Sequence, residues 1–128
     1  IFPYLQSNNI HFYAYNPLAG GLLTGKYLPC NNKNTNSRFF NNAIYQNLFW
    51  KPQYLSAVQF LYDKFGDDII NKVYSWFHTL NIDMVMGISS KNQYQHNIKG
   101  ICKLGDDDMK IFDNVYKNYI KIEQNYYY

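Results

Sequence analysis

A glycine-rich segment after a predicted strand has the residue types and spacing of an anion-binding site. The apolar run 10–15 leads into the segment 16–26, in which three glycines precede a lysine: Gly20, Gly21, Gly25 and Lys26. Glycines let a backbone approach a ligand closely, and free N–H groups next to a lysine suit an anion such as phosphate. The sequence therefore predicts that this segment binds a phosphate group.

A P-loop nucleotide site is one alternative for the same segment. Residues 20–26 have the P-loop spacing G-x-x-x-x-G-K, after which a Ser or Thr hydroxyl holds Mg²⁺. This chain has Tyr27 at that position, and its bulky phenol cannot take the place of the hydroxyl. The sequence also lacks an apolar strand that ends in a metal-binding Asp, so both features speak against a P-loop.

The periodicity of apolar residues predicts the elements that position this segment. A helix end is expected at 2–5, a strand buried on both faces at 10–15, and a long loop at 16–50 with a polar middle at 31–37. One helix should begin at Pro52 and end at Gly66, and Asp67 or Asp68 should cap the next. A buried strand follows at 82–86, then a helix from Ser90 to about 99 and a last helix from 105–106.

The segment 12–27 closely resembles the strand-7 loop of the aldo-keto reductases, in particular their aflatoxin-aldehyde (succinic semialdehyde) reductase branch. The likeness continues through shorter motifs: Arg38-Phe39-Phe40, Phe49-Trp50, the Gly87 to Asn97 run and Asn125-Tyr126-Tyr127. The resemblance implies an α/β fold, the C-terminal part of a (β/α)₈ TIM barrel. It would comprise the last two βα units and a closing helix at 106–121. A barrel needs roughly 250 residues, and this chain of 128 begins with Ile1. We therefore expect a partial domain, 1–128, whose N-terminal half is missing.

The resemblance also implies an NADP (NADPH) site in three parts. A loop wraps the pyrophosphate and comprises Asn16, Leu18, Gly20, Gly21, Leu22, Thr24, Gly25 and Lys26. Arg38 contacts the cofactor, for which Arg–phosphate geometry is the physical reason. A helix N-terminus meets the adenosine 2′-phosphate with Ser89, Ser90, Lys91, Gln93 and Asn97, of which Gln93 and Asn97 lie one turn apart. Many family members have Arg where this chain has Gln93, which leaves Lys91 as the nearest cation.

Each part of this site has a structural alternative. The loop could be a glycine-rich turn, Lys26 and Arg38 could be solvated, and Ser90 with Gln93 could form a capping box. Tyr45 matches a tyrosine that lines the substrate pocket of the branch. Leu48 stands where the branch has an Arg for an acidic substrate, so a carboxylate-bearing aldehyde is not favoured.

The resemblance places the family's catalytic Asp, Tyr, Lys and His on early strands, upstream of this chain. No residue here is therefore predicted to be catalytic. The hypothesis is the cofactor-binding part of an NADPH-dependent enzyme that reduces an aldehyde or ketone, inactive on its own. The alternative is a non-catalytic remnant or pseudoenzyme that acts through a partner.

Composition argues against several other classes. A net charge of +3, without a basic stripe, does not suggest nucleic acid binding, and no apolar run approaches a membrane span. Cys30 and Cys102 lack metal or redox spacing, which indicates free thiols in a reducing, cytoplasmic compartment. No metal site is predicted from the three histidines or from Asp106–Asp108, which suit a helix start. A homodimer is possible, because half a barrel would leave apolar faces uncovered.

Overall fold

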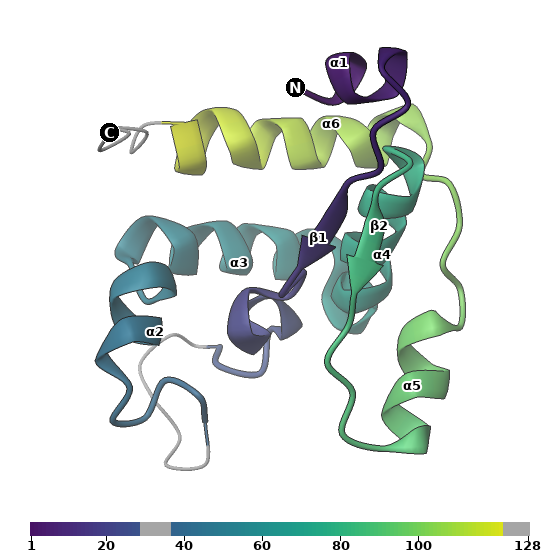
Figure 1. Cartoon of the computed structure of the whole chain (residues 1–128). Coiled ribbons are helices and arrows are strands. Elements are labelled where there is room, and N and C mark those ends of the chain that lie inside the picture. The colour runs from purple at the N-terminus through teal and green to yellow at the C-terminus, as the bar shows by residue number, and fades with distance from the viewer. Residues whose placement is uncertain (29–36, 122–128) are drawn as a thin grey trace.

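The chain folds into a mostly helical α/β arrangement around a small parallel sheet. The computed structural model describes residues 1–28 and 37–121, and Cys30, the polar stretch 31–36 and the motif 125–127 lie outside them. Strand β1 (Tyr13–Tyr15) pairs in parallel with β2 (Asp83–Val85), with Ala14 opposite Met84 (Figure 1). The strands predicted at 10–15 and 82–86 are thus adjacent and parallel, as two consecutive βα units require.

The predicted helices occur in the expected order along the chain, and one additional helix, α2 (Ala43–Phe49), lies among them. They are α1 (Phe2–Ser7), α2 (Ala43–Phe49), α3 (Pro52–Phe65), α4 (Ile69–Thr79), α5 (Lys91–Ile98) and α6 (Asp106–Val115). Short 3₁₀ segments lie at η1 (Ala19–Thr24) and η2 (Gly66–Asp68), and a π-helical turn, η3 (Tyr116–Ile120), continues α6. The predicted helices at 52–65 and at 106–121 are thus confirmed.

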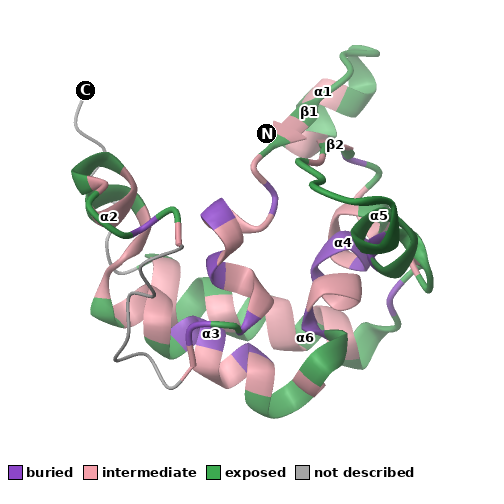
Figure 2. Ribbon diagram, turned by 90° about the horizontal axis from the view of Figure 1, so that it is seen from below, coloured by how far each residue is buried: buried purple, intermediate pink, exposed green. Residues whose placement is uncertain are grey.

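The core lies where α3, α4 and α6 meet. Leu61, Ile69 and Val73 are each at most 3% exposed and form one apolar cluster. Phe65 of α3 stacks on Phe112 of α6, with ring centroids 5.6 Å apart. In Figure 2 the buried residues gather on α3, α4 and the segment after β1, whereas α5 is almost entirely exposed. Leu18 and Leu23, in the segment after β1, pack against this core.

Two predictions about the strands and loops need correction. The strands are three residues long and not buried on both faces: Tyr13 is 63%, Tyr15 84% and Val85 57% exposed. The reason is that Tyr13, Tyr15 and Val85 lie on one face of the two-stranded sheet, and the described residues do not cover that face. The segment 16–50 is not one long loop, because η1 and α2 lie within it.

Local hydrogen bonds explain the helix starts. The Asn42 side chain accepts a hydrogen bond from the Tyr45 N–H (3.1 Å) and so caps α2. The predicted cap of α4 is wrong in its detail. Asp68 occupies the N-cap position without a side-chain hydrogen bond, and the Asp67 carboxylate instead accepts one from the Tyr62 hydroxyl (3.0 Å).

Candidate functional site

The glycine-rich segment turns sharply as soon as β1 ends. Asn16 has a φ of +55°, and its side-chain oxygen accepts a hydrogen bond from the Gly20 N–H at 2.8 Å. Gly20, Gly21 and Gly25 follow with φ of +70°, +95° and +75°. Residues with a β-carbon avoid this left-handed region, so the three glycines are what allows η1 to fold back on itself.

Most of the segment's N–H groups are already used within it. Gly21 N–H donates to the Leu18 carbonyl (2.9 Å), Gly25 N–H to the Leu22 carbonyl (3.4 Å) and Lys26 N–H to the Thr24 hydroxyl (3.3 Å). The expectation of free backbone donors is therefore wrong for these positions, because the left-handed residues close successive turns. The Leu18 N–H has no hydrogen-bond partner among the described residues and remains available as a donor.

Lys26 supplies a positive charge at this turn. Its ammonium lies 4.9 Å from the centroid of the Tyr27 ring, and 3.5 Å from the position that a β-carbon on Gly21 would take. The side chain therefore folds back over Gly21 while the residue stays exposed to solvent. An anion that approached Gly21 would meet this ammonium directly.

Tyr27 belongs to the core and not to a metal site. The residue is 6% exposed, and its ring meets Phe39 and Trp50 edge-on, at centroid distances of 5.3 and 5.5 Å. Its hydroxyl is buried without a hydrogen-bond partner among the described residues. The position where a P-loop needs a magnesium-binding hydroxyl is thus filled by packing, which argues against the P-loop alternative.

The predicted substrate residue lies against the predicted cofactor segment. A β-carbon on Gly20 would lie 2.8 Å from Cε1 of Tyr45. The half-buried Tyr45 ring is held between Phe39 and Phe49, at centroid distances of 6.1 and 5.8 Å. Arg38 is exposed on the turn before α2, next to the fully buried Phe39. The fold thus brings Gly20 and Tyr45 together and leaves Arg38 at the surface.

The second predicted segment begins a helix after β2. The Ser90 hydroxyl accepts a hydrogen bond from the Gln93 N–H (3.1 Å), and the Gln93 side chain accepts one from the Ser89 N–H (2.7 Å). This reciprocal pair is the predicted capping box, except that Gln93 reaches Ser89 and not Ser90. Residues 89–93, including Lys91, are all exposed, so the start of α5 faces solvent.

Asn97 lies apart from the rest of its predicted group. It is 3% exposed and lies near Tyr74 of α4, which is 1% exposed. Gln93 and Asn97 were expected to share one face of α5, but Gln93 is exposed and Asn97 is buried. Gln93 turns back to the N-terminus of α5, whereas Asn97, one turn later, packs on α4. Sequence reasoning missed Tyr74, because nothing in a single sequence pairs it with Asn97.

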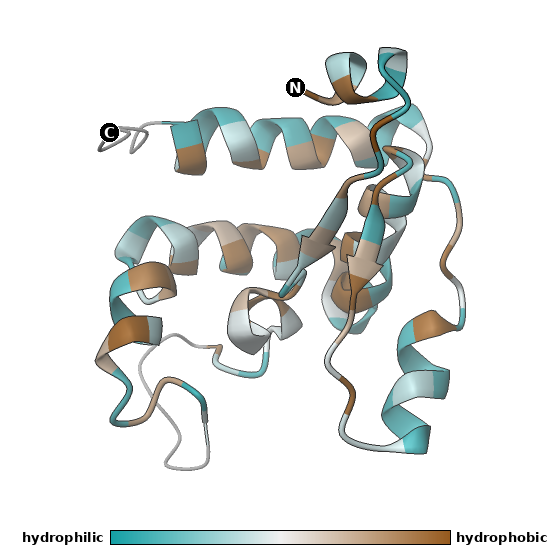
Figure 3. Ribbon diagram, in the orientation of Figure 1, coloured by the Kyte–Doolittle hydropathy of each residue, from teal (hydrophilic) through white to brown (hydrophobic). Residues whose placement is uncertain are grey.

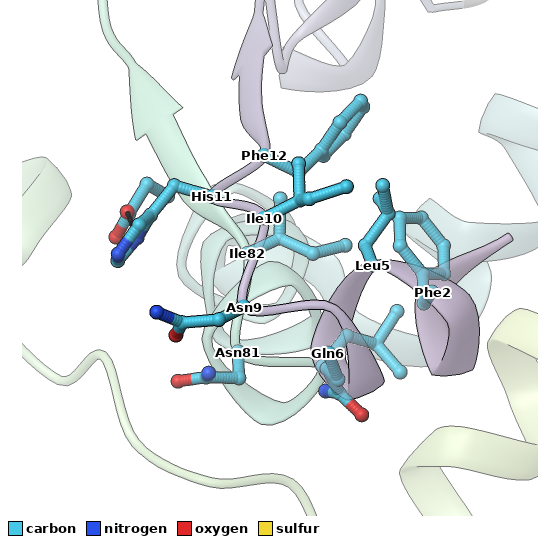
Figure 4. Close-up of a pocket in the computed structure, with 11 residues that line it drawn as sticks. Phe2, Leu5, Gln6, Asn9, Ile10, His11, Phe12, Asn81 and Ile82 are labelled. Atoms are coloured by element: carbon cyan, nitrogen blue, oxygen red, sulfur yellow. Dashed lines mark ion pairs between the residues drawn. The ribbon is translucent and has the colours of Figure 1, made fainter.

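The remaining candidates do not form a site. No group of three or more potential metal ligands occurs in residues 1–28 and 37–121. No helix in those ranges is both long and apolar enough to cross a bilayer. A cavity of about 380 Å³ lies between α1, the residues just before β1 and the start of β2, and there the Nδ1 atom of His11 is 3.9 Å from Oδ2 of Asp83 (Figure 4). None of the predicted cofactor residues lines it.

Comparison with known proteins identifies the family. The family model described as "Aldo/keto reductase family" matches residues 1–117. The chain belongs to the aldo/keto reductase family. It is 33% identical to human "Aflatoxin B1 aldehyde reductase member 2" over 117 residues, which cover 77% of this chain and 33% of that protein. Human "Aldo-keto reductase family 7 member A3" is 32% identical, with 77% and 35% covered. The resemblance to the aflatoxin-aldehyde reductases is confirmed.

The chain spans about a third of the length of the curated relatives it matches. It is therefore a partial aldo/keto reductase domain, mostly helical with two parallel strands. One predicted cofactor segment of this domain begins directly after β1, and the other begins four residues after β2.

Proposed function

We propose that this chain is the cofactor-binding, C-terminal part of an NADPH-dependent aldo/keto reductase that reduces aldehydes or ketones to alcohols. In this proposal β1 and β2 are the last two strands of a (β/α)₈ barrel, and α6 is its closing helix. The observation that carries it is the placement of the two phosphate-binding candidates. One begins at Asn16, directly after β1, and the other at Ser89, four residues after β2 ends.

The carboxyl ends of parallel strands are where this fold class binds its ligands. Because β1 and β2 are parallel and adjacent, with Tyr15 opposite Val85, both candidates leave the sheet at the same end (Figure 1). NADP carries phosphates at two separate points, the pyrophosphate and the 2′-phosphate. Two anion-binding segments at one end of the sheet suit such a ligand better than a single isolated turn would.

The segment after β1 fits the pyrophosphate. The Lys26 ammonium lies over Gly21, and the Leu18 N–H has no partner among the described residues, so a cation and a donor are available there. Arg38 is also exposed. Its guanidinium would add a second positive charge, which can bind phosphate with two parallel hydrogen bonds. The other N–H groups shape the turn, and in this proposal their role is to hold it in place.

The start of α5 fits the 2′-phosphate. The first N–H groups of a helix have no acceptor within the helix, and the helix dipole favours an anion there. Ser90 already accepts from the Gln93 N–H, which leaves the N–H groups of Lys91 and Asn92 and the Lys91 ammonium for a ligand. An NADP-type cofactor carries this additional phosphate and an NAD-type cofactor does not.

The bound cofactor would supply a hydride to the carbonyl carbon of the substrate. Tyr45, held against Gly20, would line the substrate side of the site. No proton donor is assigned to this chain, because the resemblance places the catalytic Asp, Tyr, Lys and His upstream. The chain's own contribution is to bind and orient the cofactor.

Replacement of Lys91 tests the proposal. In the complete natural protein, Lys91→Glu should weaken NADPH binding about tenfold, roughly the 1–2 kcal/mol of one charge-assisted contact. NADH should be affected much less. Lys99→Glu, the same charge change just after the other end of α5, is the matched control and should spare both cofactors. Titration of both cofactors against each variant measures this, and equal losses for NADPH and NADH would contradict the proposal.

The non-catalytic alternative is favoured by a different observation. An apolar cavity of about 870 Å³ opens between α1, α3, α4 and α6, and is lined by Leu61, Val73 and Trp76 among others. A remnant that acts through a partner would need such a surface. The transcript upstream of Ile1 distinguishes the two readings, because the enzyme requires the Asp, Tyr, Lys and His there.

A further inference from the structure

The hydroxyl of Tyr27 is a buried polar group in an apolar cluster. The residue is 6% exposed, and its oxygen has no hydrogen-bond partner among the described residues. Its ring packs with Leu22, Phe39 and Val58, and Figure 3 shows hydrophobic stretches on α2 and α3, the helices that contact η1. A buried hydroxyl without a partner destabilises the fold, because its hydrogen bond to water is lost and not replaced. A phenylalanine would fill the same space without that cost.

One small space beside Gly21 is bordered by this hydroxyl and by a cation. An atom at the β-carbon position of Gly21 would lie 3.5 Å from Nζ of Lys26 and 4.0 Å from Oη of Tyr27. Both are ordinary van der Waals separations, and Gly21 has no side chain to fill the space. Because an ammonium and a phenol hydroxyl can both donate hydrogen bonds, the space suits an acceptor with negative charge, such as a phosphate oxygen.

The two donors differ in how firmly they are held. The Tyr27 ring is fixed by edge-on contacts with Phe39 and Trp50, at centroid distances of 5.3 and 5.5 Å. Lys26 is exposed, and its ammonium lies 4.9 Å from the centroid of the Tyr27 ring at the end of a flexible stem. The Lys26 side chain can therefore turn toward a ligand, whereas the hydroxyl keeps its place beside Gly21.

We infer that Tyr27 is a further binding residue of this turn, whose hydroxyl donates a hydrogen bond to a phosphate oxygen in the space beside Gly21. The inference rests on the proposed function, in which this turn binds the cofactor pyrophosphate. When the Lys26 ammonium turns to pair with the phosphate, the space opens and the ligand supplies the acceptor that the described residues do not provide. Because NADPH and NADH share the pyrophosphate, the hydrogen bond contributes equally to both.

Tyr27→Phe in the complete natural protein is the test, because it removes the hydroxyl and keeps the buried ring. Calorimetric titration should show that the affinities for NADPH and NADH each fall about tenfold, the scale of one hydrogen bond to a charged group. Tyr54→Phe is the matched control: its ring packs against the same cluster, and both affinities should stay unchanged. The melting temperature of cofactor-free Tyr27→Phe should be unchanged or higher, since the variant loses no hydrogen bond of the free protein. A lower melting temperature would show a structural partner for the hydroxyl and contradict the inference.

A double variant adds a readout that a purely structural role would not change. Gly21→Ala places a methyl group in the space where the phosphate oxygen binds, so in this background Tyr27→Phe should change both affinities by less than about twofold. Unchanged affinities in Tyr27→Phe alone, or the same loss in both backgrounds, would overturn the inference and leave the proposed function intact. If the unaltered protein binds neither NADPH nor NADH, the proposed function fails and the inference fails with it, so the two failures are distinguishable.

Discussion

The substitution Gly20→Ala separates two reasons for the glycines in η1. Gly20 and Gly21 both have left-handed backbones, with ψ of 13° and 6°, so an alanine at either is strained by a similar amount. Their surroundings differ. A β-carbon at Gly20 would lie 2.8 and 2.9 Å from two atoms of the Tyr45 ring. One at Gly21 would make ordinary contacts, 3.5 Å from the flexible end of Lys26 and 4.0 Å from the Tyr27 hydroxyl.

These contacts set the expected magnitudes. The left-handed conformation costs an alanine ~1–2 kcal/mol, which is the whole effect expected for Gly21→Ala. Gly20→Ala adds the displacement of a ring that Phe39 and Phe49 hold in place, an overpacking cost of ~1–3 kcal/mol. Gly20→Ala should therefore lower the free energy of unfolding by ~2–5 kcal/mol in total.

Urea unfolding of the complete natural protein, followed by circular dichroism and tryptophan fluorescence, measures the difference. Trp50 is a suitable reporter, because its ring lies 4.9 Å from that of Phe39 in the same cluster. A Tyr45→Ala background removes the clash, so Gly20→Ala should then cost no more than Gly21→Ala. Equal costs for the two glycines in the wild-type background, or no coupling between Gly20 and Tyr45, would refute this reasoning.

Three further predictions concern the chain as a whole. The isolated residues 1–128 should oxidise no NADPH with simple aldehydes, because no proton donor is assigned to them; turnover well above the blank would contradict this. They should also self-associate through the open sheet edges and the exposed Tyr15, and Tyr15→Lys should shift their gel-filtration peak toward the monomer. Finally, burial raises the pKa of Tyr74, and the hydrogen bond to Asp67 raises that of Tyr62, from the ordinary value of 10.0. A tyrosine whose pKa is raised in the folded state contributes stability below about pH 10, and this contribution is lost as the pH rises above about 10. Melting temperatures should therefore fall from about pH 10 upward, and the fall should be less steep in Tyr62→Phe and Tyr74→Phe.

The sequence was most informative where a local rule decides the structure. Pro52 and Gly66 marked the ends of α3, and the Ser90–Gln93 spacing indicated the capping box, because each depends on residues within one turn. The parallel pairing of β1 and β2 followed from the element order and from the resemblance to the last two βα units of a barrel. Exposure was predicted poorly for these strands. An apolar strand indicates a buried position, but what covers Tyr13 and Tyr15 depends on elements that the described residues do not supply.

Side-chain pairing was beyond the reach of a single sequence. Asn97 was assigned to the cofactor by resemblance, and only the fold shows that α4 places Tyr74 against it. The glycine spacing likewise predicted an anion-binding turn, but not that Asn16 would occupy the Gly20 N–H. The first difference arises from burial between two helices and the second from a hydrogen bond, and both depend on backbone directions that residue types do not specify.

The two candidate segments would contribute to cofactor binding by different physical means. The turn after β1 is fixed by its own hydrogen bonds, so its ligand would meet a rigid surface with charges from Lys26 and Arg38. The start of α5 is exposed to solvent and offers helix N–H groups and Lys91. A pyrophosphate is common to NADH and NADPH, whereas the 2′-phosphate belongs to NADPH alone. Substitutions in the turn should therefore weaken both cofactors alike, and selectivity between them should depend on the start of α5.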